Sequence, residues 1–204
     1  MQHSPDDKRI RSFVALDVTP PVRAALQTLV AELAATKADV RWVPPAGMHL
    51  TLKFLGAVEA AHLDRVHAAL AAAVHEQAAL QLRVRGLGAF PSLRRPRVLW
   101  VGLRGAGLVE LARLVEQTLE PLGFAPEPRP FAPHITLGRV GSLRGWERLE
   151  EVYKGHLDDD FGDSPVDLVT IYRSTLHPEG AIYSSLWTIP LRRHKEGATY
   201  DTGR

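Results

Sequence analysis

Two short stretches of the sequence, HLTL at residues 49–52 and HITL at residues 134–137, repeat the pattern His-x-Thr-Leu. In an extended strand, successive side chains point to opposite faces. The histidine and threonine of each stretch therefore share one face, and its two aliphatic residues share the other. We interpret each stretch as a strand with an apolar side for a core and an imidazole and a hydroxyl on the opposite side. If the two strands lie side by side, two imidazoles and two hydroxyls meet in one small volume.

A pair of imidazoles indicates acid–base catalysis, because histidine titrates near neutral pH. One of His49 and His134 would take a proton and the other would give one, which is what opening a cyclic phosphodiester by water requires. We expect Thr51 and Thr136 to hydrogen-bond the non-bridging phosphate oxygens, where charge grows toward the transition state. We expect no metal ion and no other cofactor. A single such motif is more simply explained as a half-buried strand histidine, and it is the repetition that favours catalysis.

Two cations are candidates for assisting at the phosphate, since charge-assisted hydrogen bonds to phosphate are strong. Lys53 has the same parity as the first histidine and threonine, so simple alternation points it into the same cleft. Arg139 has the opposite parity to the second pair, and it reaches the cleft only if the strand ends or bulges at Gly138. Spacing alone therefore favours Lys53.

The order of expected elements also repeats. Phe13 precedes His49 by 36 residues and Leu99 precedes His134 by 35, and each interval contains an apolar strand, a helix and a proline-containing turn. This spacing predicts two pseudo-symmetric lobes that face each other. The periodicity predicts helices over 20–37, 59–78, 107–122 and 143–153, an acidic loop over 156–167, and strands over 11–18, 40–43, 49–55, 80–90, 98–103, 166–176 and 182–189. We expect one folded domain over residues 11–190, a flexible segment over 1–10 and a disordered tail over 191–204.

Composition and net charge limit the classes of protein and of site that the chain can form. The 204 residues carry a net charge of +2 and no cysteine, which excludes disulfides, thiol catalysis and a polycation that coats nucleic acid. No segment is typical of a signal peptide or a membrane span, so we expect a monomeric cytoplasmic protein that does not bind membranes. Residues 81–109 contain no acid and six arginines, which suits a site for a limited number of phosphates: Arg83, Arg85, Arg94, Arg95, Arg97 and Arg104.

Five stretches together resemble a known superfamily. They are RSFVALDV (11–18), HLTLKFLG (49–56), FPSLRRPRVLWVG (90–102), PHITLGR (133–139) and STLHPEGAIYSSL (174–186). The chain is similar to two-histidine (2H) phosphoesterases, and within them to bacterial and archaeal RNA 2′,3′-cyclic phosphodiesterases, long labelled 2′-5′ RNA ligases. The resemblance implies a bilobal α+β fold in which two antiparallel-rich sheets form a central cleft with helices on the outside. It also implies metal-independent hydrolysis of RNA 2′,3′-cyclic phosphate ends to 2′-phosphates.

The resemblance assigns roles to the motif residues. It makes His49 the general acid for the leaving 3′ oxygen and His134 the general base for water. Thr51 and Thr136 match the threonines that hold the phosphate. Arg139 matches an arginine that contacts the phosphate, so the resemblance ranks it above the lysine favoured by parity.

Contacts with the body of the RNA are harder to assign. Phe13 and Phe131 are candidates for stacking on a base, although core packing is the simpler role for both. Further candidates for RNA contacts are Lys53, Arg94, Arg95 and Arg97. The partner we expect is an RNA with a 2′,3′-cyclic phosphate end, with tRNA-derived ends among the candidates. Two alternatives stay open: ATP-independent 2′-5′ ligation, which is the reverse reaction, and a non-catalytic protein that binds RNA ends.

Overall fold

The computed structural model describes residues 9–177 and 181–192. The strands are β1 (Arg9–Asp17), β2 (Val40–Trp42), β3 (His49–Glu59), β4 (Leu80–Phe90), β5 (Val98–Arg104), β6 (His134–Val140), β7 (Asp160–Val166), β8 (Leu168–Thr175) and β9 (Ile182–Pro190). The helices are α1 (Pro20–Ala35), α2 (Ala60–Val74), α3 (Leu108–Leu119) and α4 (Trp146–Gly155), with short 3₁₀ turns η2 (Pro45–Gly47) and η3 (Glu120–Leu122).

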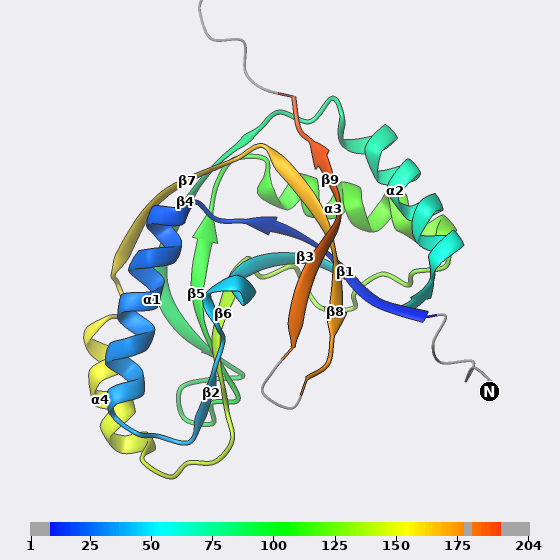
Figure 1. Cartoon of the computed structure of the whole chain (residues 1–204). Coiled ribbons are helices and arrows are strands. Elements are labelled where there is room, and N and C mark those ends of the chain that lie inside the picture. Colours follow the sequence, from blue (N-terminus) through cyan, green and yellow to red (C-terminus); the bar gives the residue numbers. More distant parts are fainter. Residues whose placement is uncertain (1–8, 178–180, 193–204) are drawn as a thin grey trace, which may run out of the picture.

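The strands form one curved antiparallel sheet in the order β7-β4-β5-β6-β3-β1-β8-β9, and β2 pairs with β6 beside this path (Figure 1). Its two halves meet between β6 and β3, where the register consists of one residue pair, Leu50 with Ile135. The predicted bilobal α+β fold is therefore confirmed. The two sheets expected for the lobes are joined edge to edge at this single pair.

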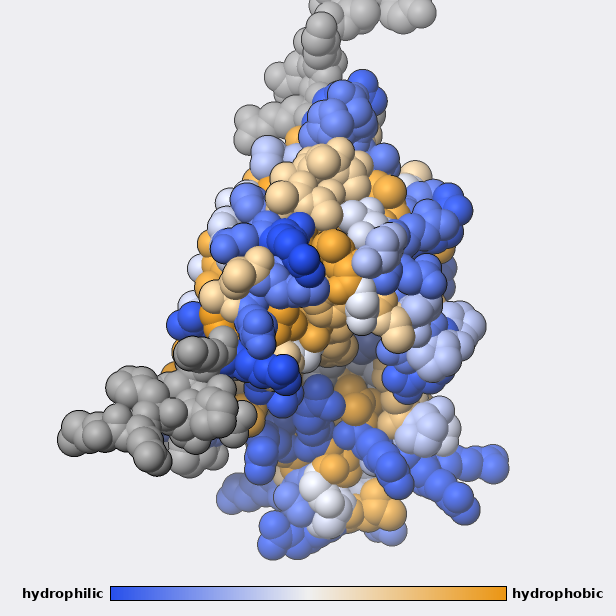
Figure 2. Space-filling model, turned by 90° about the vertical axis from the view of Figure 1, so that its right-hand side faces the viewer, coloured by the Kyte–Doolittle hydropathy of each residue, from blue (hydrophilic) through white to orange (hydrophobic). Residues whose placement is uncertain are grey.

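The helices connect the lobes as well as covering them. α1 follows β1 but lies against β7 of the other half, and α3 follows β5 but lies against β3. In Figure 1, α1 and α4 cover the half built from β4, β5 and β7, and α2 and α3 lie together over the other half. Polar and apolar residues are interspersed on the face that Figure 2 shows, as expected for a surface that meets water. None of the helices in the described residues has the length and apolarity needed to cross a membrane.

The core lies between the helices and the face of the sheet that they cover. In α1 the buried residues recur at helical spacing and turn one side toward the sheet: Val22, Leu26, Leu29 and Leu33. Leu50 and Ile135 are almost fully buried at the junction of the two halves. The other face of β3 and β6 at the junction, which carries the histidines and threonines, is only partly buried.

One prediction about the chain's organisation needs correction. The acidic segment expected to be a loop contains the edge strand β7, which pairs with β4, and Arg83 of β4 forms ion pairs with Asp160 and Asp163 across this pairing. The single domain expected over 11–190 stays a prediction, and the described backbone continues its pairing at both ends of that range. β1 begins at Arg9, and the backbone N–H of Arg192 donates to the Gln77 carbonyl. The remaining parts of the expected terminal segments, 1–8 and 193–204, lie outside the described residues.

Candidate active site

The junction pair brings the two His-x-Thr motifs together. In antiparallel strands, a step of one residue from the Leu50–Ile135 pair places His49 beside Thr136 and Thr51 beside His134. Because the two aliphatic residues are buried on the core side, the histidines and threonines occupy the opposite face. The two motifs thus form a local two-fold arrangement of four polar side chains. This is the convergence that the repeated motif predicts.

A β-bulge determines the direction of Arg139. Leu99 of β5 pairs with Gly138 and Trp100 pairs with Thr136, so Leu137 is an extra residue in β6. The extra residue reverses the alternation beyond it, which puts Arg139 on the same face as Thr136. The charge of Arg139 also lowers the pKa of the second histidine, as a nearby cation does. The parity argument against Arg139 is therefore wrong.

The same irregularity in β3 turns Lys53 away. Val14 of β1 pairs with Lys53 and Ala15 pairs with Thr51, so β3 also contains one extra residue, at Leu52. Lys53 consequently faces the core, where its ammonium donates hydrogen bonds to the Glu116 carboxylate and to a backbone carbonyl of residue 125. With only 6% of its surface exposed, it is not available to a phosphate or to RNA. The expectation that Lys53 lies in the cleft is wrong.

Phe54 occupies the position in β3 that Arg139 occupies in β6, since each follows its motif histidine by five residues. It pairs with Phe13 of β1, whose ring stacks on His49, so Phe54 lies on the cleft face. Its side chain is 70% exposed, which is unusual for a large aromatic residue. Phe54 was missed in the sequence, although the matching offset in the two motifs was a usable signal.

Aromatic side chains surround the imidazole ring of His49. Its imidazole stacks on Phe13 with ring centroids 4.7 Å apart, and the edge of Tyr183 lies 5.2 Å away. Its Nδ1 atom is buried and has no hydrogen-bond partner among the described residues. Desolvation lowers the pKa of His49 to about 4, opposed by the negative charge of Asp17 and assisted by the positive charge of Arg23.

Among the described residues, Asp17 is therefore the group whose charge favours the protonated form of His49. It pairs with His49 in the register between β1 and β3. Its carboxylate accepts hydrogen bonds from the Tyr172 hydroxyl at 2.7 Å and the Thr170 hydroxyl at 3.4 Å, and lies 3.5 Å from the Arg23 guanidinium. These contacts from β8 and α1 fix its orientation. No pattern in the sequence singles out this residue.

His134 has a different environment. Its Nδ1 lies 2.7 Å from the carbonyl oxygen of Ala132, and because a carbonyl only accepts, Nδ1 carries the proton of the neutral ring. The lone pair is then on Nε2. Burial lowers the pKa of His134, and the charge of Arg139 lowers it further, while the hydrogen bond to Ala132 raises it. A neutral imidazole with a free Nε2 is suited to accept a proton.

The structure places the other candidates as follows. Phe13 is 3% exposed and already stacked, so it has no free face for a base, and the stacking expectation for it is wrong. Phe131 is half-buried and packs against the core. Three exposed arginines lie in the loop between β4 and β5, and their contact with RNA stays a prediction: Arg94, Arg95 and Arg97.

No group of three or more His, Cys, Asp or Glu side chains within 9–177 and 181–192 is arranged to hold a metal ion.

Comparison with known proteins agrees with this architecture. The model of the family described as LigT like Phosphoesterase matches the chain twice, over residues 16–100 and 103–183, and each match contains one His-x-Thr motif. The chain belongs to this phosphoesterase family. The two matched segments correspond to the two motif-bearing segments deduced from spacing.

Relatives and structural neighbours of this LigT-like phosphoesterase cover nearly the whole chain. An RNA 2′,3′-cyclic phosphodiesterase of Methanothermobacter thermautotrophicus is 31% identical over 179 residues, covering 87% of this chain and 97% of the relative. The enzyme of the same name from Thermotoga maritima is 34% identical over 182 residues, covering 87% and 94%. The structure of TT0787 of Thermus thermophilus superposes with a TM-score of 0.77 at 30% identity, covering 90% of this chain and 99% of that one. The structure of Escherichia coli LigT complexed with 3′-AMP has a TM-score of 0.71 at 26% identity, covering 90% and 98%.

The charge of Asp17 should be visible in the titration of His49. In an Asp17→Asn variant, the amide still accepts the Tyr172 hydrogen bond but loses the charge that stabilises the imidazolium. We therefore expect the pKa of His49, followed by NMR of the imidazole, to fall below the value of about 4 that the native site sets. Asp64→Asn on the exposed side of α2 is the matched control and should leave it unchanged. An unchanged or higher pKa in Asp17→Asn would refute the electrostatic role.

Proposed function

We propose that the protein hydrolyses the 2′,3′-cyclic phosphate end of RNA to a 2′-phosphate without a metal ion. The observation that carries the proposal is the face on which two histidines and two threonines are joined by the Leu50–Ile135 pair, with Arg139 beside them. The relatives named RNA 2′,3′-cyclic phosphodiesterase support the same reaction and substrate.

The proton transfers follow from the two histidine environments. His134 Nε2 takes a proton from water as the water oxygen forms a bond to phosphorus. The bond from phosphorus to the 3′ oxygen breaks on the opposite side, and His49 Nε2 gives its proton to that oxygen. Each histidine thus changes protonation once, and proton exchange with solvent restores both.

His49 must be protonated to act as the acid, although burial lowers its pKa in the free protein. The negative charge of the bound cyclic phosphate opposes this effect, because a nearby anion favours the imidazolium. The charge of Asp17 also raises the pKa of His49. The acid is therefore charged most readily when the substrate is bound.

The remaining residues stabilise charge on the phosphate and position the nucleotide. Thr51 and Thr136 donate hydrogen bonds to the non-bridging oxygens, and the guanidinium of Arg139 makes charge-assisted bonds to the same group. Phe54, exposed on the face of the first histidine, offers a ring on which the terminal base stacks. The cleft thus has a cation on one side of the histidine pair and an aromatic ring on the other.

We also propose a substrate class, an oligomeric state and a cellular location for the enzyme. The substrate is RNA, with tRNA-derived ends among the candidates, and the enzyme acts as a monomer. The absence of cysteine suits a reducing compartment, and we propose a cytoplasmic location.

The decisive assay uses an RNA oligomer ending in a 2′,3′-cyclic phosphate, in the presence of EDTA. The wild type should convert it to the 2′-phosphate, and His49→Ala and His134→Ala should each reduce turnover by about a hundredfold or more. His75→Ala, at an exposed histidine after α2, is the matched control and should retain full activity. Loss of activity in EDTA that Mg²⁺ restores would contradict the mechanism. Binding of the RNA without conversion would indicate a protein that only holds RNA ends, and joining to a 5′-hydroxyl end would indicate the ligation direction.

Removing the exposed ring should weaken substrate binding without disturbing the proton transfers. We expect Phe54→Ala to lower kcat/KM by about tenfold, because stacking a base on an aromatic side chain contributes roughly 1–3 kcal/mol. Phe54→Trp should restore most of the loss. Val109→Ala, at an exposed apolar residue of α3, is the control. A cyclic phosphate on an abasic ribose should be hydrolysed equally by wild type and Phe54→Ala, and an equal loss on that substrate would exclude stacking as the cause.

A further inference from the structure

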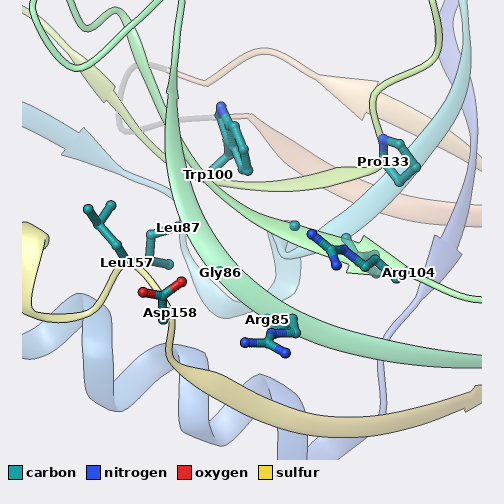
Figure 3. A pocket seen from close by; sticks show the side chains of 10 residues that line it. Arg85, Gly86, Leu87, Trp100, Arg104, Pro133, Leu157 and Asp158 are labelled. Atoms are coloured by element: carbon teal, nitrogen blue, oxygen red, sulfur yellow. The ribbon is translucent and has the colours of Figure 1, made fainter.

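Pro133, the residue before the second histidine, lines a cavity of about 430 Å³ that none of the roles described above uses (Figure 3). Its walls come from β4, β5, the residue before β6 and the segment after α4. The residues that line it include Arg85, Trp100, Gly102, Arg104, Pro133 and Asp158. A volume of this size lies within the range of pockets that hold small organic ligands, roughly 300–1,000 Å³.

The cavity begins next to the reacting groups. Gly102 of its wall pairs with His134 in the register between β5 and β6, and Pro133 directly precedes that histidine. The ring centroid of Trp100 lies 6.4 Å from that of His134. Neighbouring strands are about 5 Å apart. The cavity wall at Gly102 is therefore one strand spacing from His134. At this distance, a neighbouring part of the same substrate molecule can reach the cavity.

A shift in the register between β4 and β5 opens the cavity. Val84 pairs with Leu103 and Leu87 with Val101, so the two residues between them, Arg85 and Gly86, face Gly102 alone. The backbone N–H groups of Gly86 and Leu87 are held by the carbonyls of residues 159 and 157. Gly86 has a φ of +76°, and a Cβ atom on Gly102 would lie 3.0 Å from the Arg85 carbonyl. Both positions therefore favour glycine, which keeps the cavity open.

The charges in the cavity fit an anion. Arg85 and Arg104 line it, and neither forms an ion pair with a carboxylate in the described part of the chain. Arg83, two residues earlier on β4, is by contrast paired with Asp160 and Asp163. One acid, Asp158, also lines the cavity, and Figure 3 shows it on the side opposite Arg104. Two arginines and one aspartate leave a formal charge of +1, which matches the single negative charge of one phosphodiester.

We propose that this cavity binds the nucleotide on the 5′ side of the reacting end, with Arg85 and Arg104 contacting its phosphodiester. The inference rests on the proposed function and adds a second subsite to it. Trp100 and Pro133 provide apolar surface for the sugar and base, and the two guanidinium groups provide donors for the phosphate. The enzyme consequently prefers an RNA end over a mononucleotide that carries the same cyclic phosphate.

The test compares two substrates, 2′,3′-cyclic AMP and the dinucleotide ApA with a 2′,3′-cyclic phosphate end. For the wild type, kcat/KM should be about tenfold or more higher for the dinucleotide, because it adds charge-assisted hydrogen bonds. Its log–log dependence on salt should be steeper by about 0.7, as expected for one additional phosphate contact on a single strand. Arg85→Ala/Arg104→Ala should remove both differences while hydrolysing 2′,3′-cyclic AMP at the wild-type rate. Arg113→Ala/Arg148→Ala, at exposed arginines of α3 and α4, is the matched control.

The outcomes separate this inference from the proposed function. If the wild type hydrolyses neither substrate, the proposed function fails, and the subsite fails with it. If it hydrolyses both with equal kcat/KM, or if Arg85→Ala/Arg104→Ala keeps the preference for the dinucleotide, the reaction stands and the subsite is overturned. Loss of the preference in Arg94→Ala/Arg95→Ala/Arg97→Ala, but not in Arg85→Ala/Arg104→Ala, would also overturn it and place the RNA along the loop between β4 and β5.

Discussion

The pairing of Leu50 with Ile135 determines the geometry of the whole site. It is the register pair between β3 and β6, and it joins two half-sheets whose other strands pair within their own lobe. Because both side chains are buried in the core, the residues on either side of them must face the cleft. A slip of one residue in either strand would turn one histidine and one threonine into the core. The packing of two aliphatic residues thus fixes the position of four polar ones.

The β-bulges in β3 and β6 make the two symmetric halves of the site chemically different. Both motif strands carry an extra residue after the threonine, at Leu52 and Leu137, so in both the fifth residue after the histidine returns to the cleft face. In β6 that residue is Arg139, and in β3 it is Phe54. One side thus presents a cation and the other an aromatic ring, as an asymmetric substrate requires. The histidines differ in the same way, since a backbone carbonyl sets the tautomer of His134 while buried aromatic rings and Asp17 set the charge of His49.

The sequence predicted the features that depend on local alternation and missed those that depend on the partner strand. The two motifs, their faces and their convergence follow from a period of two and an internal repeat. The directions of Lys53 and Arg139 do not, because each bulge is visible only in the register with the partner strand, β1 for the lysine and β5 for the arginine. The strand character of the acidic segment was missed for a similar reason, since it depends on the pairing of β7 with β4. Asp17 acts through contacts with β8 and α1 that no local pattern encodes.

A substrate with an altered leaving atom distinguishes the proposed acid from the proposed base. In a 2′,3′-cyclic phosphate whose bridging 3′ oxygen is replaced by sulfur, the leaving thiolate needs little protonation, because thiols are far more acidic than alcohols. The measurement is the single-turnover rate of this RNA with His49→Ala and His134→Ala. If His49 is the acid, the sulfur restores the rate of His49→Ala toward that of the wild type and leaves His134→Ala impaired. Rescue of His134→Ala, or of neither variant, would contradict the assignment.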